Sequence, residues 1–188
     1  LMIFNNINYE FDIFFAMSHG VASGKLKKGK TDGREELLFK ISNNINIKEN
    51  FYGYNDIEPI WASNFMDQIS KSLMGLNLNS GIPLNLYSSD RIATYIGNGL
   101  LTFIDKNYNF NTLYESDEFV SYEDENDLIQ KIIYYKSNLN EAKKIAKKGW
   151  EKSHRNFNSE NVCDYMIKKT FNKKYNSKFW DEISFTSI

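Results

Sequence analysis

The sequence predicts a single α/β domain of Rossmann-like type, with a mainly parallel sheet and helices on both of its faces. Three observations favour this class. Short, nearly continuous apolar runs alternate with longer amphipathic stretches, which is the order of strands and helices in βα repeats. The runs are apolar on both of their faces, as in a parallel sheet covered by helices on each side. The length of 188 residues suits one domain.

The apolar runs give the expected strands. The clearest lie at residues 11–17, 72–79 and 100–104, with the sequences FDIFFAM, SLMGLNLN and LLTFI. Weaker runs at 51–53 and 118–122 are candidates for further strands. Because the runs are joined by helical stretches rather than tight turns, we expect parallel pairing between them.

Five stretches carry a helical spacing of apolar residues or a helix-start signal. The first opens on Asp32, with Glu35 three residues later in the spacing of a capping box. The others are expected at 64–71, from Ser88-Ser89-Asp90-Arg91 to Gly97-Asn98-Gly99, from Asp127, and from about Asn140. Strands and helices therefore alternate along most of the chain.

Composition excludes several classes of protein. Lys and Arg number 23 against 24 Asp and Glu, so we expect no nucleic-acid partner. One Cys and two His cannot build a disulfide framework or an ordinary structural zinc site, and Cys163 is expected to be buried in a C-terminal helix. No apolar run is long enough to span a membrane, and the start lacks a signal peptide. We expect a cytoplasmic protein.

Two loops at the expected carboxyl ends of strands are candidate sites, because ligands of open parallel sheets bind there. The first spans residues 18–34, where Gly20 supplies a backbone donor and Arg34 a cation for a diphosphate. His19 is a weak candidate for a catalytic base, although a loop histidine is commonly incidental. The GxGxxG pattern of dinucleotide-binding domains is absent.

The second candidate site is the helix start at Ser88, Ser89, Asp90 and Arg91. Backbone N–H groups, two hydroxyls and a guanidinium converge there, and the helix end carries partial positive charge. These groups suit a diphosphate, with Arg91 donating a pair of hydrogen bonds. The alternative is an ordinary helix cap with no ligand.

Charge is unevenly spread along the second half of the chain. Between residues 105 and 127 there are eight acidic residues and one Lys, whereas 131–178 carries thirteen basic residues and four acidic ones. A solvated helix face is the plain interpretation of the basic stretch. The alternative is a peripheral contact between the basic C-terminal helices and the inner membrane surface.

Three segments in this order resemble the donor-binding, C-terminal domain of GT-B glycosyltransferases, in particular the CgeB-like (spore maturation protein-like) group-1 family. They are Leu76-Asn77-Leu78-Asn79-Ser80-Gly81, Ser88-Ser89-Asp90-Arg91 and Gly97-Asn98-Gly99-Leu100-Leu101-Thr102-Phe103. The later segments Phe119-Val120-Ser121-Tyr122, Asp127-Leu128-Ile129, Ile132-Ile133-Tyr134-Tyr135 and Ala146-Lys147-Lys148-Gly149 are also similar to that family. The resemblance covers about residues 12–157.

The resemblance implies a hexosyl-type, metal-independent transferase without a cofactor, whose donor substrate is a nucleotide sugar. It implies that Arg91 lies near the donor diphosphate, and that Thr94 lies near the ribose, where members commonly carry Glu. The acceptor, a glycan or cell-envelope component, is held mostly by an N-terminal domain, which we expect to be missing from this chain. The chain alone is then expected to be inactive.

The resemblance also implies a division of the chain. Residues 1–10 are expected to be a residual linker or the start of the first strand, 11–157 the nucleotide-sugar-binding domain, and 158–188 a C-terminal helical extension. Two alternatives stay open: a non-catalytic module that binds a nucleotide sugar or a protein, and a flavodoxin-like or response-regulator-like domain. The last requires an acidic pair after the first strand, which the sequence lacks.

Overall fold

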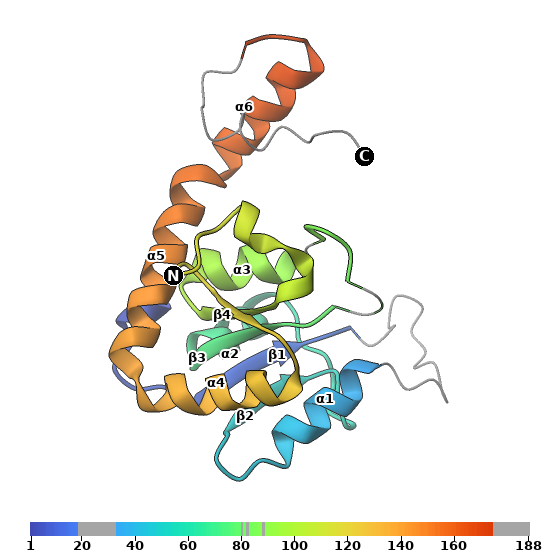
Figure 1. Cartoon of the computed structure of the whole chain (residues 1–188), viewed down its shortest axis with the longest axis vertical. Coiled ribbons are helices and arrows are strands. Elements are labelled where there is room, and N and C mark those ends of the chain that lie inside the picture. Colours follow the sequence, from blue (N-terminus) through green and yellow to red (C-terminus); the bar gives the residue numbers. More distant parts are fainter. Residues whose placement is uncertain (19–32, 80, 82, 88, 175–188) are drawn as a thin grey trace.

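A five-stranded, all-parallel sheet forms the centre of the protein (Figure 1). The computed structural model describes residues 1–18, 33–79, 81, 83–87 and 89–174. The strands are β1 (Phe11–Ala16), β2 (Glu49–Tyr52), β3 (Ser72–Asn77), β4 (Leu101–Asp105) and β5 (Val120–Tyr122), in the order β2-β1-β3-β4-β5. Every strand pair is parallel, which confirms the predicted fold class.

Helices cover both faces of the sheet. The covering helices are α1 (Gly33–Ser42), α2 (Ala62–Ser70), α3 (Asp90–Asn98), α4 (Glu125–Ser137) and α5 (Leu139–Asn156). A further helix, α6 (Ser159–Thr170), follows α5, and short 3-10 turns lie at Ile3–Asn5, Lys106–Tyr108 and Phe110–Thr112. Apolar residues of α1, α4 and α5 share one buried cluster with the sheet, and residues of α2 and α3 share another. The arrangement is the helix–sheet–helix sandwich of a Rossmann-like domain.

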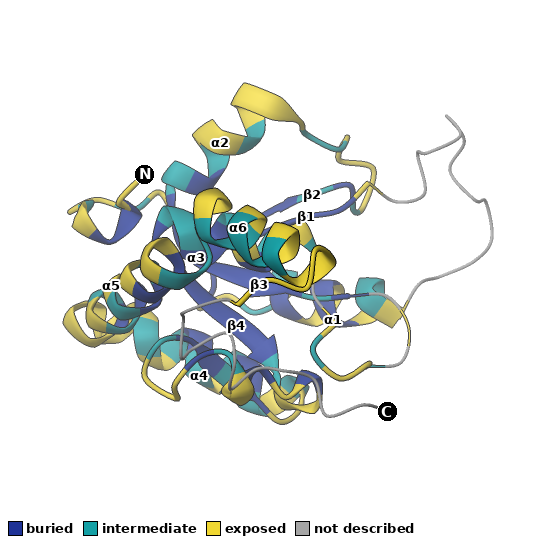
Figure 2. Ribbon diagram, turned by 90° about the horizontal axis from the view of Figure 1, so that it is seen from above, coloured by how far each residue is buried: buried dark blue, intermediate teal, exposed yellow. Residues whose placement is uncertain are grey.

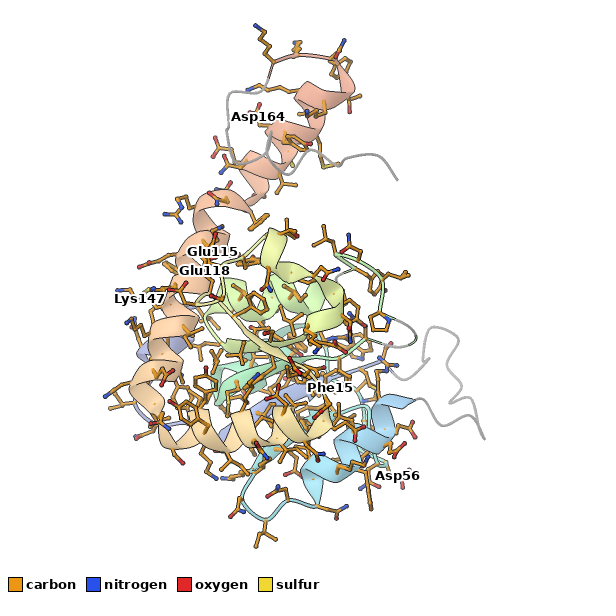
Figure 3. All side chains as sticks on the ribbon, viewed as in Figure 1. Phe15, Asp56, Glu115, Glu118, Lys147 and Asp164 are labelled. Atoms are coloured by element: carbon orange, nitrogen blue, oxygen red, sulfur yellow. The ribbon has the colours of Figure 1, made fainter. Side chains whose placement is uncertain are left out.

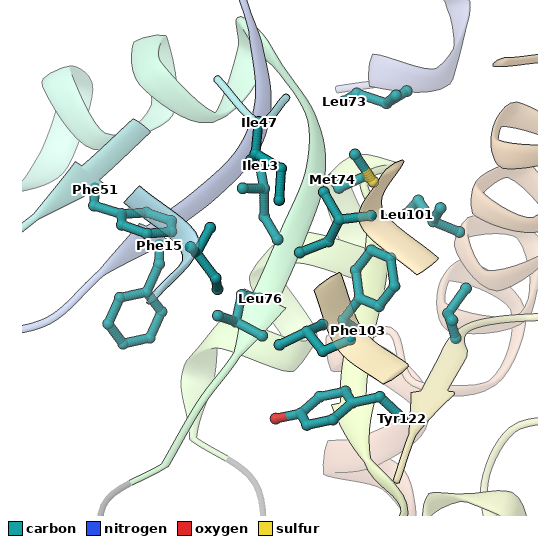
Figure 4. Close-up of a cluster of buried hydrophobic side chains, with 14 of the residues drawn as sticks. Ile13, Phe15, Ile47, Phe51, Leu73, Met74, Leu76, Leu101, Phe103 and Tyr122 are labelled. Atoms are coloured by element: carbon teal, nitrogen blue, oxygen red, sulfur yellow. The ribbon is translucent and has the colours of Figure 1, made fainter. Parts of the chain in front are cut away.

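Adjacent residues of β1 serve the two faces, as the two-residue period of a strand requires. Phe14 packs edge-on against Phe65 and Tyr95 on the α2–α3 side. Phe15 points to the opposite side, where it meets Phe51 and belongs to the cluster drawn in Figure 4. Most strand residues are consequently buried, and the central strand β3 is buried along its whole length, as the dark ribbon at the middle of Figure 2 shows.

Some bounds differ from those expected. Helix α4 begins at Glu125 rather than at Asp127, because Asp124 is its N-cap and accepts a hydrogen bond from the Asp127 N–H at 2.9 Å. Residues 1–10 contain a 3-10 turn whose Phe4 ring packs edge-on against Trp150 of α5. The prediction that Cys163 is buried was wrong: it is exposed, because α6 has no buried residue and extends away from the sheet (Figure 1).

Burial of the Tyr114 hydroxyl gives the fold an alkaline limit. Desolvation raises the pKa of Tyr114 to about 12, against about 10 in an unfolded chain. Between pH 10 and 12 only the unfolded state releases this proton. The free energy of unfolding therefore falls by about 1.4 kcal/mol for each unit that the pH rises. In urea unfolding at pH 9 and pH 11, Tyr114→Phe should lose about 1.4 kcal/mol less than the parent. An equal loss would contradict the assignment.

Candidate functional site

The candidate site lies at the carboxyl edge of the sheet, between β1 and β3. From β1 the chain goes outward to β2 on one side, and β3 then pairs with β1 on its other side. The strand order therefore reverses at the β1–β3 pair. In open parallel sheets, ligands bind in the crevice beyond the strands at such a reversal.

Arg91 lies directly over this reversal. Its Nη2 donates to the Leu78 carbonyl at 2.8 Å and to the Asn79 Oδ1 at 3.0 Å, both just after β3. Its guanidinium carbon lies 5.2 Å from the ring centroid of Phe15, whose place in β1 is labelled in Figure 3. Burial lowers the pKa of Arg91, and the nearby charge of Arg34 acts in the same direction. The sequence-predicted cations Arg34 and Arg91 thus face one region.

The start of α3 is as predicted in position and differs in its contacts. Ser89 is the N-cap, yet its side chain does not cap the helix. The Ser89 Oγ instead donates to the Asn77 Oδ1 at 3.4 Å, which ties the helix start to the last residue of β3. The structure therefore brings Ser89 and Arg91 together at the end of β3. Ser88 lies outside the described residues.

Three buried donors at the end of β3 have no acceptor among the described residues. They are the Asn77 Nδ2, the Asn79 Nδ2 and the Arg91 Nε. Asn77 is fully buried and Asn79 is 7% exposed. Buried polar groups in folded proteins are nearly always paired, so a cluster of unpaired donors marks this end of β3 as unusual.

A cavity of about 280 Å³ opens beside Asn79. Its walls come from the start of α1, the segments after β3, β4 and β5, and the start of α4: Gly33, Arg34, Leu37, Leu78, Asn79, Gly81, Pro83, Asp105, Tyr108, Tyr122, Glu123, Asp124 and Glu125. Arg34 thus lies at the cavity. One wall carries this cation and another carries carboxylates.

The acidic wall was not predicted from the sequence. Asp105 accepts from the backbone N–H of Asn107 at 2.8 Å, and Asp124 caps α4. Glu123 pairs with Lys106 at 3.1 Å. These local contacts leave carboxylate lone pairs that can accept hydrogen bonds from hydroxyl groups of a ligand. One sequence signal could have indicated this wall: Asp105 follows directly after an expected strand, and ligands of parallel sheets bind at strand ends.

The remaining predicted residues fall elsewhere. The Thr94 Oγ1 donates to the Asp90 carbonyl of its own helix at 2.9 Å. Like Ser89 and Arg91, Thr94 is not among the residues lining the cavity. His19 and Gly20 lie outside the described residues. One motif was missed in the sequence. Residues 24–31, GKLKKGKT, have the GxxxxGK[ST] spacing of phosphate-binding loops and lie between β1 and α1 in the chain. They too lie outside the described residues.

The described part of the chain bears on three other possibilities: a metal site, a membrane-spanning helix and a cationic surface. No three His, Cys, Asp or Glu side chains there are grouped to hold a metal ion, and none of its helices could cross a bilayer. Six of the twelve Lys and Arg residues described between positions 131 and 174 form ion pairs with carboxylates, in Lys131–Asp127, Lys136–Asp12, Lys147–Glu151, Lys148–Asp117, Lys152–Glu118 and Lys168–Asp164. For these six residues the solvated helix face is the favoured interpretation.

Comparison with known proteins agrees with the resemblance at the family level. Residues 33–168 match the model of a family described as "Glycosyl transferase-like". The matched range covers the cavity, the start of α3 and four of the five strands. Neither the curated proteins nor the solved structures gave a match. Because the family model spans more than half of the sequence, the chain belongs to the glycosyl transferase-like family.

Proposed function

We propose that this domain binds the donor nucleotide sugar of a GT-B glycosyltransferase of the CgeB-like group, which transfers a hexosyl unit to a glycan or cell-envelope acceptor. The observation that carries the proposal is the position of Arg91. A partly buried cation and the start of α3 meet at the strand-order reversal of a glycosyl transferase-like domain. This is where a parallel sheet offers its ligand site and where a diphosphate gains most from a helix N-terminus.

The residues would act on the leaving group of the transfer. The bond between the anomeric carbon and the diphosphate oxygen breaks, and negative charge grows on the diphosphate. Arg91, Arg34 and the positive end of α3 are placed to stabilise that charge, which is metal-independent leaving-group stabilisation. The acidic wall can accept hydrogen bonds from sugar hydroxyls. The acceptor and the rest of the reacting geometry would come from a second domain, so we propose that this chain alone is inactive.

Calorimetric titration with UDP, GDP, ADP and CDP tests the proposal. One of these should bind with clear base preference, and the corresponding nucleotide sugar should compete with it. ATP and GTP belong in the same panel, because the spacing from Gly24 to Thr31 would favour a triphosphate. Preference for triphosphates, or binding of none of these nucleotides, would contradict a nucleotide-sugar site.

Thr94→Glu tests the position of the ribose. Thr94 lies one helical turn after Arg91, so both can touch successive parts of one nucleotide. A carboxylate accepts hydrogen bonds from ribose hydroxyls more strongly than a neutral hydroxyl does, so nucleoside diphosphate affinity should rise about tenfold. Thr94→Gln is the uncharged control and should give a smaller gain. Unchanged or weaker binding of Thr94→Glu by a folded protein would place the ribose elsewhere.

A second candidate is a non-catalytic module that binds a nucleotide sugar. The observation that favours it concerns Thr94, which stands where members of the resembled family commonly carry Glu. Its hydroxyl donates to the backbone of its own helix, and it offers no carboxylate to a ribose. Adding the acceptor-binding domain in trans discriminates the two functions. Transfer by the reconstituted pair supports the transferase, whereas binding without transfer supports the module.

A further inference from the structure

The buried amides of Asn77 and Asn79 form a feature that the proposed diphosphate contacts of Arg91 and α3 do not use. Asn77 is the last residue of β3, and Asn79 lies two residues beyond it. Both amide oxygens contact the start of α3, Asn77 through Ser89 and Asn79 through Arg91. Both are at least nine-tenths buried, and neither Nδ2 has an acceptor among the residues that the structure describes. The Nε of the adjacent Arg91 is likewise buried without an acceptor among those residues.

The orientation of the Asn79 amide is fixed by chemistry. Arg91 can only donate hydrogen bonds, so the atom of Asn79 that faces its Nη2 at 3.0 Å must be the oxygen. The amide NH₂ must then point away from the guanidinium. In Asn77 the oxygen accepts from the Ser89 hydroxyl at 3.4 Å, and its NH₂ group has no acceptor among the described residues.

A set of donors without acceptors is matched by an anion. An unpaired buried donor lowers the free energy of unfolding by about 1–3 kcal/mol, so three together are a large destabilisation for a domain of this size. Water or a neutral hydroxyl would need acceptors as well as donors around it, whereas a phosphoryl group offers acceptor oxygens only. Asn79 lines the cavity of about 280 Å³ that Arg34 borders, whereas Asn77 and Arg91 are not among its lining residues. A ligand in the cavity therefore adjoins the cluster at Asn79.

We infer that Asn79 and Asn77 are binding residues of a phosphate subsite, with their NH₂ groups donating to phosphoryl oxygens beside Arg91. The inference rests on the proposed function for its ligand, the diphosphate of a nucleotide sugar. It extends the site from the start of α3 to the end of β3. The Asn79 oxygen holds the guanidinium of Arg91 in place while its NH₂ contacts the ligand.

Asn79→Asp separates the two halves of this amide. The aspartate keeps an oxygen toward Arg91 and replaces the NH₂ with a second, negatively charged oxygen, at almost the same size. We expect at least tenfold weaker binding of the preferred nucleoside diphosphate and of inorganic pyrophosphate, because a donor is lost and a like charge is added. The melting temperature should equal or exceed that of the parent, since the oxygen facing Arg91 is now charged.

Two further variants control for charge and for folding. Asn109→Asp makes the same chemical change in the loop after β4, where the amide donates to the Asn85 Oδ1 at 2.9 Å outside the cavity lining, and affinity should stay within about twofold. Asn77→Asp probes the second amide and provides the test if Asn79→Asp does not fold. Asn79→Leu removes the NH₂ without adding charge, and should weaken binding less than Asn79→Asp does.

The outcomes separate this inference from the proposed function. Loss of both ligands in Asn79→Asp, with Asn109→Asp unchanged, supports the subsite. Equal binding by the folded parent, Asn79→Asp and Asn77→Asp overturns it and leaves the nucleotide-sugar function standing. A parent that binds pyrophosphate but no nucleoside diphosphate, with that binding lost in Asn79→Asp, keeps the subsite and overturns the proposed function. A parent that binds neither overturns both.

Discussion

Arg91→Ala should weaken the binding of nucleoside diphosphates between tenfold and a hundredfold. A charge-assisted contact to phosphate is worth about 1.5–3 kcal/mol, and Arg91 is a partly buried cation at the strand-order reversal. The substitution also removes the full positive charge of Arg91, and the partial positive charge at the N-terminus of α3 is too small to replace its attraction for the diphosphate. Isothermal titration of the parent and the variant with the preferred nucleoside diphosphate measures the change.

The same substitution has a structural consequence that must be measured beside affinity. Without the guanidinium, the Leu78 carbonyl and the Asn79 Oδ1 each lose a donor, at a cost of about 1–3 kcal/mol in stability. Arg91→Lys keeps the charge but lacks the fork that reaches both acceptors, so its affinity should lie between those of the parent and Arg91→Ala. If Arg91→Ala stays folded and binds as the parent does, Arg91 is a local support of the β3 end and the diphosphate role is excluded.

The fold was predictable because its strands are buried on both faces. Residues such as Phe14 and Phe15 point to opposite sides of the sheet and are both fully buried, which is why β1 appears in the sequence as an apolar run interrupted only by Asp12. The edge strand β2 is short, and it was predicted only from its last residues. Strand order and register depend on contacts between distant segments, and no single run encodes them.

The site was predictable only in part, for a physical reason. Ser89 and Arg91 carry a local signal, because a helix start has a recognisable residue pattern. Asn77 and Asn79 belong to a segment on which the family resemblance rests, but no local pattern marks their amides as ligand donors. An amide near a strand end becomes informative only when contacts with Arg91 and Ser89 of another segment define its orientation. The exposure of Cys163 likewise depends on where α6 lies, which its periodicity does not reveal.

Gly149→Ala should destabilise the domain by about 2–4 kcal/mol, opposite in sign to the usual effect of this substitution in a helix. A Cβ at Gly149 would lie 2.2 Å from the Glu118 carbonyl oxygen and 3.3 Å from the Ile96 Cγ2. The first contact is with backbone, which cannot rotate away. Figure 3 places Glu118 beside α5, where its carboxylate pairs with Lys152 at 3.5 Å. The glycine therefore lets α5 reach the segment before β5.

Gly97→Ala is the matched control, since Gly97 also lies within a helix, α3, and its nearest atom to a Cβ is the Ser153 Oγ at 3.9 Å. With that room, alanine should stabilise the protein by about 0.5–1 kcal/mol through backbone entropy. Urea unfolding of the two variants and the parent measures both changes. Similar gains in both would show that α5 does not press on the Glu118 backbone. Opposite signs would show that close approach, rather than helix propensity, requires glycine at position 149.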